Sequence, residues 1–132
     1  MPILNVTLST APDAALSARV ADTLSQLTAS LLGKNPAVTA VAISHVDPAH
    51  WFVAGKSLAE HGKASFFLDT RITDGTNTKD EKAAYVAAVF TRIGELIGPI
   101  HEESYVHVHD VRGDAYGYGG KTQDYRYIAA KV

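Results

Sequence analysis

The sequence predicts an α+β protein in which two tandem β-α-β units form a four-stranded mixed sheet with two helices on one face. The main observation behind this prediction is that both halves of the 132-residue chain show the same order of patterns. Each half has an alternating, strand-like stretch, an amphipathic helix, a glycine-containing break and a second strand-like stretch. The two strands of such a unit are parallel and joined by a right-handed crossover, so two units give a mixed sheet.

The halves also share the spacing of their markers, which indicates an internal repeat. Lys56 and Lys121, each preceded by glycine, are 65 residues apart. A chain of 132 residues is long enough to bury one core of its own. We therefore expect a single domain, residues 1–132, with pseudo-repeats at about residues 2–60 and 65–127. A chance recurrence of the β-α-β order is the alternative.

Two stretches have the signals of amphipathic helices, at about residues 13–32 and 79–97. The first begins at Asp13, a good N-terminal capping residue, and ends before Gly33. The apolar residues expected to face the core are Leu16, Val20, Leu24, Leu27 and Leu31 in the first helix and Ala84, Val86, Val89, Phe90, Ile93 and Leu96 in the second. The last segment, residues 124–132, alternates enough to predict a short edge strand.

Composition and charge exclude several classes of protein. The net charge is −2 and no basic stripe is present, so we expect no nucleic-acid partner. The chain has no cysteine, which excludes disulfides and thiolate chemistry. No apolar run approaches the length of a membrane span and no signal peptide is visible, so we expect a cytoplasmic protein without a membrane partner.

The strands alternate, and their second face carries polar and aromatic side chains. The residues expected on this face, away from the helices, are Asn5, Thr7, Asp69, Arg71, Tyr105, His107 and His109. A solvent-exposed sheet face is one interpretation. Because Ile3 and Phe67 lie among these residues, a surface covered by another subunit is the other interpretation. His107 and His109 suggest a metal pair, but no third ligand has a diagnostic spacing, so we expect no metal site.

Pro2 stands directly before the first strand-like stretch, and two interpretations of it are open at this point. The first residue of a strand tolerates the missing N–H of proline, so Pro2 can be a purely structural residue. If Met1 is removed, however, Pro2 becomes a secondary amine fixed to a rigid sheet. Such an amine can act as a general base.

Four segments together resemble the tautomerase superfamily, which includes 4-oxalocrotonate tautomerase and macrophage migration inhibitory factor. They are Met1-Pro2 leading into a strand, GKNPAVTAVAI (33–43), DGTNTKDEK (74–82) and YVHVHDVRGDAYGYGG (105–120). The resemblance covers most of the chain, and two units in one polypeptide match the longer members. It implies a homotrimer, no cofactor, and proton transfer next to a carbonyl with the N-terminal proline, here Pro2, as the base.

The resemblance also implies further site residues. Lys34 corresponds to a lysine that lines the pocket in members similar to migration inhibitory factor. Tyr105 and His107 stand where such members have a tyrosine and an asparagine that reach the pocket of a neighbouring subunit. Phe52, beside Trp51, falls at a pocket-wall aromatic residue of the 4-oxalocrotonate branch.

Two arginines of the 4-oxalocrotonate branch have no counterpart at the matching positions. The turn after the first strand reads STAPD (9–13), and the position in the second strand is Val41. Arg71, on the face away from the helices, is the expected substitute for binding an anionic substrate or polarising its carbonyl.

We therefore expect an isomerase that moves a proton between the enol and keto forms of a small α-keto acid. Pro2, Arg71 and Tyr105 are its expected catalytic residues, with Lys34 as the other candidate for holding the carboxylate. One alternative is hydration or dehalogenation of an unsaturated acid by protonated Pro2, with Asp69 activating water. The other is a trimeric binding protein without enzymatic activity. Because the second unit lacks a terminal proline, we expect one active site per chain.

Overall fold

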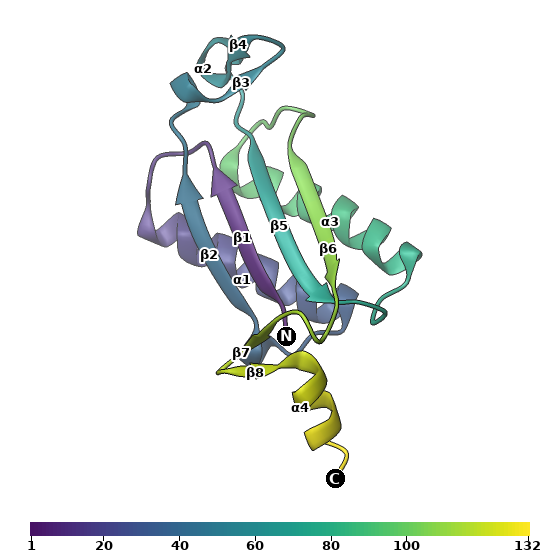
Figure 1. The fold of residues 1–132 in the computed structure, drawn as a ribbon. Coiled ribbons are helices and arrows are strands. Elements are labelled where there is room, and N and C mark those ends of the chain that lie inside the picture. The colour runs from purple at the N-terminus through teal and green to yellow at the C-terminus, as the bar shows by residue number, and fades with distance from the viewer.

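The computed structural model describes residues 1–132 and confirms the α+β fold (Figure 1). The first half contains, in order, β1 (Ile3–Leu8), α1 (Ala14–Leu32), the 3-10 helix η1 (Pro36–Val38), β2 (Ala40–His45), the 3-10 helix η2 (Pro48–His50), β3 (Phe52–Val53), β4 (Lys56–Ser57) and α2 (Leu58–His61). The second half contains β5 (Phe66–Thr73), α3 (Lys79–Ile97), β6 (Tyr105–Val111), β7 (Gly117–Tyr118), β8 (Lys121–Thr122) and α4 (Gln123–Ala129). The two long helices thus lie within one residue of their predicted limits.

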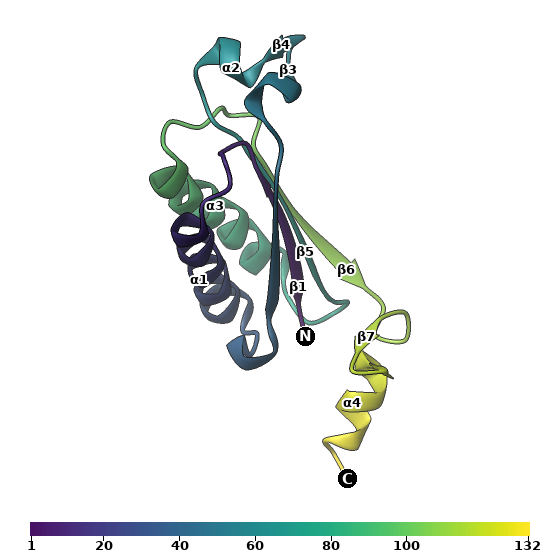
Figure 2. The ribbon, with the colours of Figure 1, turned by 90° about the vertical axis from the view of Figure 1, so that its left-hand side faces the viewer.

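A four-stranded sheet in the order β2-β1-β5-β6 forms the centre of the molecule. β1 is parallel to β2 and β5 is parallel to β6, and the two units meet where β1 runs antiparallel to β5. Both long helices cover one face of this sheet, and the other face carries no helix (Figure 2). The predicted mixed sheet with two helices on one face is therefore confirmed.

The core fills the space between the sheet and the two helices. In β1 the inward side chains are Leu4, Val6 and Leu8, each at most 1% exposed, as the alternation of the strand predicts. Val20, Leu24 and Leu27 of α1 and Val89 and Ile93 of α3 are buried against them. Fully burying an aliphatic side chain of this size contributes about 1.5–3 kcal/mol, so this layer is the main source of stability.

The buried side chains near the start of α3 differ from the prediction. The sequence predicts Ala84 and Val86 as core residues, but both are exposed, and Tyr85 is fully buried between them. The Tyr85 hydroxyl lies 3.0 Å from Oγ1 of Thr28 on α1 and 3.1 Å from Oγ1 of Thr70 on β5. Because both threonine hydroxyls partner the phenol, a tyrosine can be buried where the two helices meet the sheet.

Local signals set the ends of the long helices. The Asp13 side chain accepts two backbone N–H hydrogen bonds at the start of α1. Thr78 and Glu81 form a reciprocal capping box at the start of α3. Gly33 has φ +69°, a left-handed conformation that ends α1 and turns the chain towards β2.

The element order of the first half recurs in the second half at a constant offset. α1 and α3, β2 and β6, and β3 and β7 each begin 65 residues apart. Both hairpins turn through residues with positive φ, Ala54 and Gly55 in the first and Gly119 and Gly120 in the second. A common origin of the two halves stays a prediction.

The prediction of an edge strand at residues 124–132 is wrong. Most of this segment lies in α4, which begins with the Thr122 hydroxyl accepting a hydrogen bond from the Tyr125 backbone N–H (3.0 Å). The preceding β7–β8 hairpin leads the chain past the end of the sheet instead of along its edge (Figures 1 and 2). The segment therefore has no strand to pair with, and its backbone hydrogen bonds are made within a helix.

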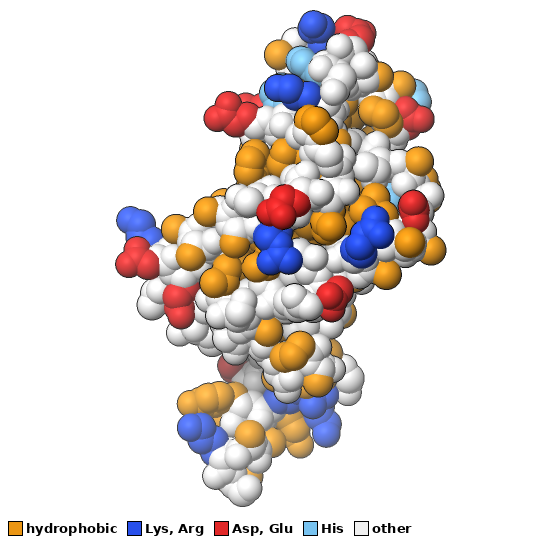
Figure 3. Space-filling view, turned by 180° about the vertical axis from the view of Figure 1, so that it is seen from behind, with side chains coloured by type: hydrophobic (Ala, Val, Ile, Leu, Met, Phe, Trp, Pro, Cys, Tyr) orange, Lys and Arg blue, Asp and Glu red, His pale blue; other side chains and the backbone are white.

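The helical side of the molecule has a mixed surface. Acidic and basic side chains are dispersed among hydrophobic and uncharged ones in this view (Figure 3). None of the helices combines the length and the apolar character needed to cross a membrane.

Replacing Tyr85 by phenylalanine should lower the free energy of unfolding by about 1–3 kcal/mol, because the buried Thr70 hydroxyl loses its side-chain partner. The Thr28 hydroxyl keeps its hydrogen bond to the Leu24 carbonyl oxygen (2.7 Å). Urea denaturation followed by circular dichroism at a fixed protein concentration measures this change. Tyr125→Phe is the matched control, since Tyr125 is 53% exposed on α4, and its effect should stay within about 0.5 kcal/mol. Equal midpoints for the two variants would contradict a stabilising role for the buried hydroxyl.

Candidate active site

A cavity of about 550 Å³ lies at the beginning of β1. Three parts of the chain form its walls: the start of β1, the segment that joins η1 to β2, and the β7–β8 hairpin with the first residue of α4. Its lining residues are Met1, Pro2, Ile3, Ala37, Val38, Thr39, Ala40, Tyr116, Gly117, Tyr118 and Gln123. Figure 1 shows the N-terminus beside this hairpin, although the two are far apart in the sequence.

The hairpin wall is held in a defined position. A Cβ atom at Gly117 would lie 1.9 Å from the Lys121 carbonyl oxygen, so only glycine allows the two hairpin strands to approach this closely. The Arg126 guanidinium stacks 3.8 Å from the centroid of the Tyr118 ring and donates a hydrogen bond to the Tyr118 carbonyl oxygen (2.9 Å). The Tyr116 hydroxyl lies 3.0 Å from Oγ1 of Thr73 on β5. These contacts fix two aromatic rings beside Pro2.

Hydrogen bonds also fix the first residues of the chain. The Ala40 backbone N–H donates to the Pro2 carbonyl oxygen (3.2 Å), and the Gln123 side-chain amide donates to the Met1 carbonyl oxygen (3.4 Å). Pro2 is buried. The nitrogen of Pro2 is therefore held at one place in the cavity wall.

The electrostatics of this end favour a neutral amine. Burial, together with the positive charge of Lys34, lowers the pKa of the Met1 α-amine below its ordinary value. Burial also lowers the pKa of Lys34 itself, while the negative charges of Glu81 and Asp110 act in the opposite direction. The Lys34 ammonium donates a hydrogen bond to Oγ1 of Thr76 (2.8 Å), and Lys34 is not one of the residues that line the cavity. It therefore acts on the Met1 α-amine through its charge and not by contact.

Arg71 lies beside the cavity, on the face of the sheet without helices. It pairs in register with Ile3 of the cavity lining, and directly opposite residues in a sheet have Cβ atoms about 4.5–5.5 Å apart. The Arg71 side chain is 50% exposed, and its Nε lies 3.5 Å from Oδ2 of Asp69. The ion pair uses only Nε, which leaves the two terminal nitrogens of the guanidinium free for an anion.

The other predicted residues lie further along the same face. His107 pairs in register with Asp69, and its ring stacks on that of His109 at 5.5 Å between centroids. Tyr105 pairs with Phe67, four residues before Arg71 on β5, a separation of about 13 Å at a strand rise of 3.3 Å per residue.

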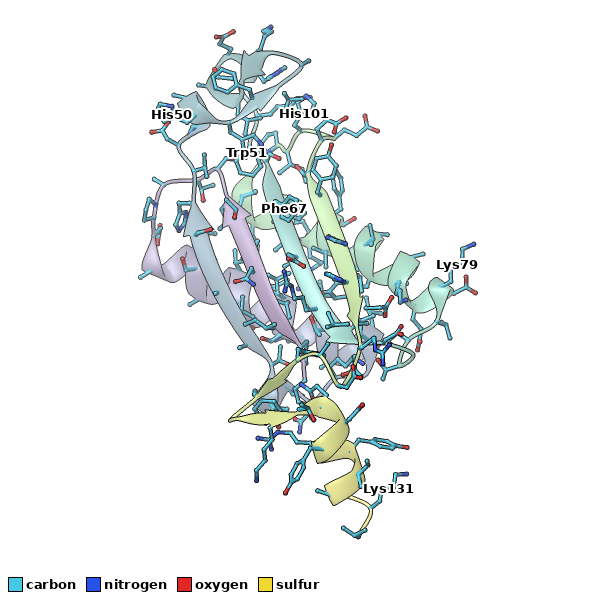
Figure 4. All side chains as sticks on the ribbon, viewed as in Figure 1. His50, Trp51, Phe67, Lys79, His101 and Lys131 are labelled. Atoms are coloured by element: carbon cyan, nitrogen blue, oxygen red, sulfur yellow. The ribbon has the colours of Figure 1, made fainter.

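Trp51 and Phe52 are at the Tyr105 end of the sheet, where they line a groove together with it. Figure 4 shows Trp51 and Phe67 at this end. One chain therefore brings together Pro2, Lys34 and Arg71, and places Trp51, Phe52 and Tyr105 at the opposite end of the sheet.

The sequence interpretation missed Tyr116, Tyr118 and Gln123 as residues of the Pro2 cavity. The repeat contained the signal, because the aromatic segment 51–53 lies 65 residues before 116–118. The antiparallel pairing of β1 with β5 places the hairpin of each unit beside the first strand of the other unit. An aromatic wall for Pro2 thus comes from the second hairpin and not from the first.

No group of three or more histidine and acidic side chains is arranged to hold a metal ion. His107 and His109 therefore stand as a stacked pair without a third ligand of this kind.

The chain thus combines an α+β fold of paired β-α-β units with a buried proline directly before its first strand. Residues 2–61 match the family model described as Tautomerase enzyme. No curated protein matches the sequence. The match to the family model lies in the first β-α-β unit of the chain.

Solved structures match the fold over nearly the whole chain. A wild-type fused 4-OT, described as a symmetric trimer, is 20% identical with a TM-score of 0.80, covering 92% of this chain and 96% of its own. A macrophage migration inhibitory factor-like protein from Entamoeba histolytica is 17% identical with a TM-score of 0.76, covering 92% and 97%. N1, a member of the cis-3-chloroacrylic acid dehalogenase family, is 19% identical with a TM-score of 0.75, covering 96% and 90%. These similarities show a shared fold.

Replacing Lys34 by methionine should raise the pKa of the Met1 α-amine, because a nearby positive charge is removed while the burial of the amine remains. The pH dependence of α-amine acylation, followed by mass spectrometry of the N-terminal peptide, measures this pKa. Lys131→Met, an exposed lysine near the end of the chain, is the control and should leave the pKa unchanged. Identical titrations of wild type and Lys34→Met would contradict the electrostatic role of Lys34.

Proposed function

We propose that this protein is a cofactor-independent isomerase that moves a proton between the enol and keto forms of a small α-keto acid. Pro2 is the general base, after removal of Met1. The observation that carries the proposal is the place of Pro2, buried in the wall of a cavity and bonded to Met1, whose α-amine has its pKa lowered by these surroundings. The match of residues 2–61 to the Tautomerase enzyme family model supports proton transfer as the class of reaction.

The chemistry follows from the state of the amine. An ordinary α-amine has a pKa of about 7.7–8.0 and is mostly protonated at neutral pH. Burial and Lys34 lower the pKa of the Met1 α-amine, and we expect the same surroundings to act on the Pro2 amine once Met1 is removed. More of that amine is then free to accept a proton, and a base works best when its pKa is near the operating pH. Pro2 nitrogen takes the proton of the enol hydroxyl and then delivers a proton to the other carbon of the enol double bond, next to the new carbonyl. This second transfer returns Pro2 to the free amine.

Arg71 and Lys34 have different roles in this proposal. The terminal guanidinium nitrogens of Arg71 are free and lie on the open face next to Ile3, so they can bind a carboxylate in a two-pronged manner. Lys34 is held by Thr76 outside the cavity and acts on the pKa of the base. A carboxylate on Arg71 places the adjacent enol carbon towards Pro2.

We also propose a homotrimer, in accordance with the fused 4-OT structures that are described as trimers. The open sheet face carries exposed Phe67 and Tyr105, the kind of surface that another subunit covers. In a trimer, Tyr105 and His107 would reach the Pro2 cavity of a neighbouring chain, since their own chain holds them away from it.

Hydration or dehalogenation is the second candidate, suggested by the dehalogenase-family structure with the same fold. That chemistry needs a carboxylate to activate water beside protonated Pro2. No carboxylate lines the cavity, and Asp69 is paired with Arg71 on the open face. The position of Asp69 thus favours isomerisation over hydration.

Replacing Pro2 by alanine should lower kcat/KM for ketonisation of phenylenolpyruvate by about 10²–10⁴, the usual contribution of a general base. Stopped-flow absorbance on protein whose intact mass shows loss of Met1 measures it. Pro48→Ala is the matched control, because Pro48 begins η2 in the first unit's hairpin region, far from the cavity.

Two outcomes would contradict the mechanism. One is equal turnover by Pro2→Ala and wild type, and the other is full activity of protein that retains Met1. A wild type that turns over neither phenylenolpyruvate nor 2-hydroxymuconate would support the binding protein instead.

Replacing Arg71 by alanine should raise KM for an enol carrying a carboxylate by roughly 10- to 100-fold, the value of one charge-assisted hydrogen-bonded contact. Steady-state kinetics with phenylenolpyruvate, compared with an uncharged enol, measures this effect. Arg112→Ala is the control, since Arg112 is exposed and paired with Asp114 at 2.9 Å. An equal loss for charged and uncharged enols would argue against carboxylate binding by Arg71.

A further inference from the structure

Gln123, the first residue of α4, lies in the wall of the Pro2 cavity and is 8% exposed. Its side-chain amide donates one hydrogen bond, which goes to the Met1 carbonyl oxygen at 3.4 Å. Figure 1 shows the start of α4 beside the N-terminus. The partner of this amide thus belongs to the residue whose removal the proposed function requires.

The Met1 carbonyl oxygen marks a place directly beside the Pro2 nitrogen. The two atoms belong to one peptide unit, in which the C=O and C–N bonds are about 1.23 Å and 1.33 Å long, so they are about 2.3 Å apart. When Met1 is removed, its carbonyl group leaves with it. The Gln123 amide then has no partner and is directed at an open place next to the free amine.

Two hydroxyl groups that line the cavity have partners that do not depend on Met1. The Thr39 hydroxyl donates to the Asn35 carbonyl oxygen (2.9 Å), and the Tyr116 hydroxyl lies 3.0 Å from Oγ1 of Thr73. Both pairs remain when Met1 leaves. The donor that its removal frees in this cavity is therefore the Gln123 amide.

The backbone around Gln123 holds its side chain in position. The Gln123 backbone N–H donates to the Tyr116 carbonyl oxygen, and the Asp124 N–H donates to the Gly113 carbonyl oxygen, each at 3.1 Å. The Thr122 side chain caps the start of α4 at the same point. A donor fixed in advance needs little reorganisation when negative charge develops beside it.

The place of the Met1 carbonyl oxygen suits the oxygen of an enol substrate. Pro2 nitrogen takes the proton of the enol hydroxyl in the proposed reaction, so this oxygen must lie within hydrogen-bonding distance of the nitrogen. It becomes negative as the proton leaves. The 3.4 Å separation is long for a hydrogen bond, and an oxygen that is not covalently tied to Pro2 can approach the amide more closely.

A neutral donor also suits the neighbourhood of a base. A carboxylate at this position would stabilise the protonated amine and raise its pKa, which would oppose the lowering by burial and by Lys34. The amide of Gln123 can donate a hydrogen bond to an oxyanion and leave the charge around Pro2 unchanged.

We propose that Gln123 is a further catalytic residue, whose side-chain amide donates a hydrogen bond to the enol oxygen and stabilises the negative charge that this oxygen gains when Pro2 takes its proton. This inference rests on the proposed function, because it assigns a role in the same reaction. The Met1 carbonyl occupies this donor before processing. Removal of Met1 thus frees the base and the donor in one step.

Replacing Gln123 by methionine removes the donor and keeps an unbranched side chain of similar length. On protein whose intact mass shows loss of Met1, kcat for ketonisation of phenylenolpyruvate should fall about 10²–10³-fold, the usual cost of losing one such donor. KM should change by about threefold or less, since the contact strengthens in the transition state. Gln26→Met is the matched control, because Gln26, the other glutamine of the chain, is exposed on α1 and its amide donates to Asp22 (2.9 Å).

Replacing Gln123 by glutamate tests the same position by a readout that a purely structural role would not move. A carboxylate beside the Pro2 amine should raise the pKa of the base. The rising limb of kcat/KM against pH should therefore move to higher pH, by about one pH unit or more. Gln26→Glu adds the same charge far from the cavity and should leave the limb in place.

The outcomes separate this inference from the proposed function. A Gln123→Met variant with the kcat of wild type, beside a Pro2→Ala variant that has lost turnover, would overturn the role of Gln123 and leave the isomerase standing. A limb that stays at the wild-type pH in Gln123→Glu would overturn it as well. A mature wild type that turns over no enol would remove the proposed function, and the role of Gln123 with it.

Discussion

The antiparallel pairing of β1 with β5 is the interaction on which the rest of this structure depends. Each β-α-β unit by itself has two parallel strands and one helix, and the pairing joins them into one four-stranded sheet. Because β1 and β5 run in opposite directions, the hairpin that ends each unit reaches the first strand of the other unit. The Pro2 cavity and the groove beside Tyr105 exist only because of this exchange of hairpins.

The same pairing explains why the two pockets lie at opposite ends and differ in chemistry. Only one of the paired strands begins at the start of the chain, so only one pocket can contain an α-amine. In that pocket, burial and the positive charge of Lys34 lower the pKa of the Met1 α-amine. The other pocket has aromatic rings and Glu103 in its walls. The same order of elements thus frames two pockets with different linings.

Much of the fold was predictable because its signals are local. The Asp13 cap and the Gly33 stop limit α1, and strand alternation separates Leu4 from Asn5. The prediction of the buried side chains at the start of α3 was wrong, because partners on other elements decide which side chain is buried there. Tyr85 is buried because Thr28 and Thr70 meet its hydroxyl, which periodicity alone does not reveal.

The candidate site was predicted only in part, for the same reason. Pro2 could be found because proline chemistry and chain position are properties of the sequence. By resemblance, Tyr105 is expected to reach the pocket of a neighbouring chain, and within one chain it lies with Phe52 at the far end of the sheet from Pro2. Tyr118 was missed, since its place beside Pro2 depends on the second hairpin folding back past the end of the sheet.

The sequence by itself determined the two β-α-β units, the limits of their helices and the residue able to become an amine base. These depend on side-chain periodicity, capping and the identity of the second residue, which act over a few positions. The tertiary structure alone decided which hairpin faces which strand, which cation lies near the amine, and that residues 124–132 turn mostly into a helix. Those outcomes depend on contacts between segments that are far apart in the sequence, such as Gln123 and Met1.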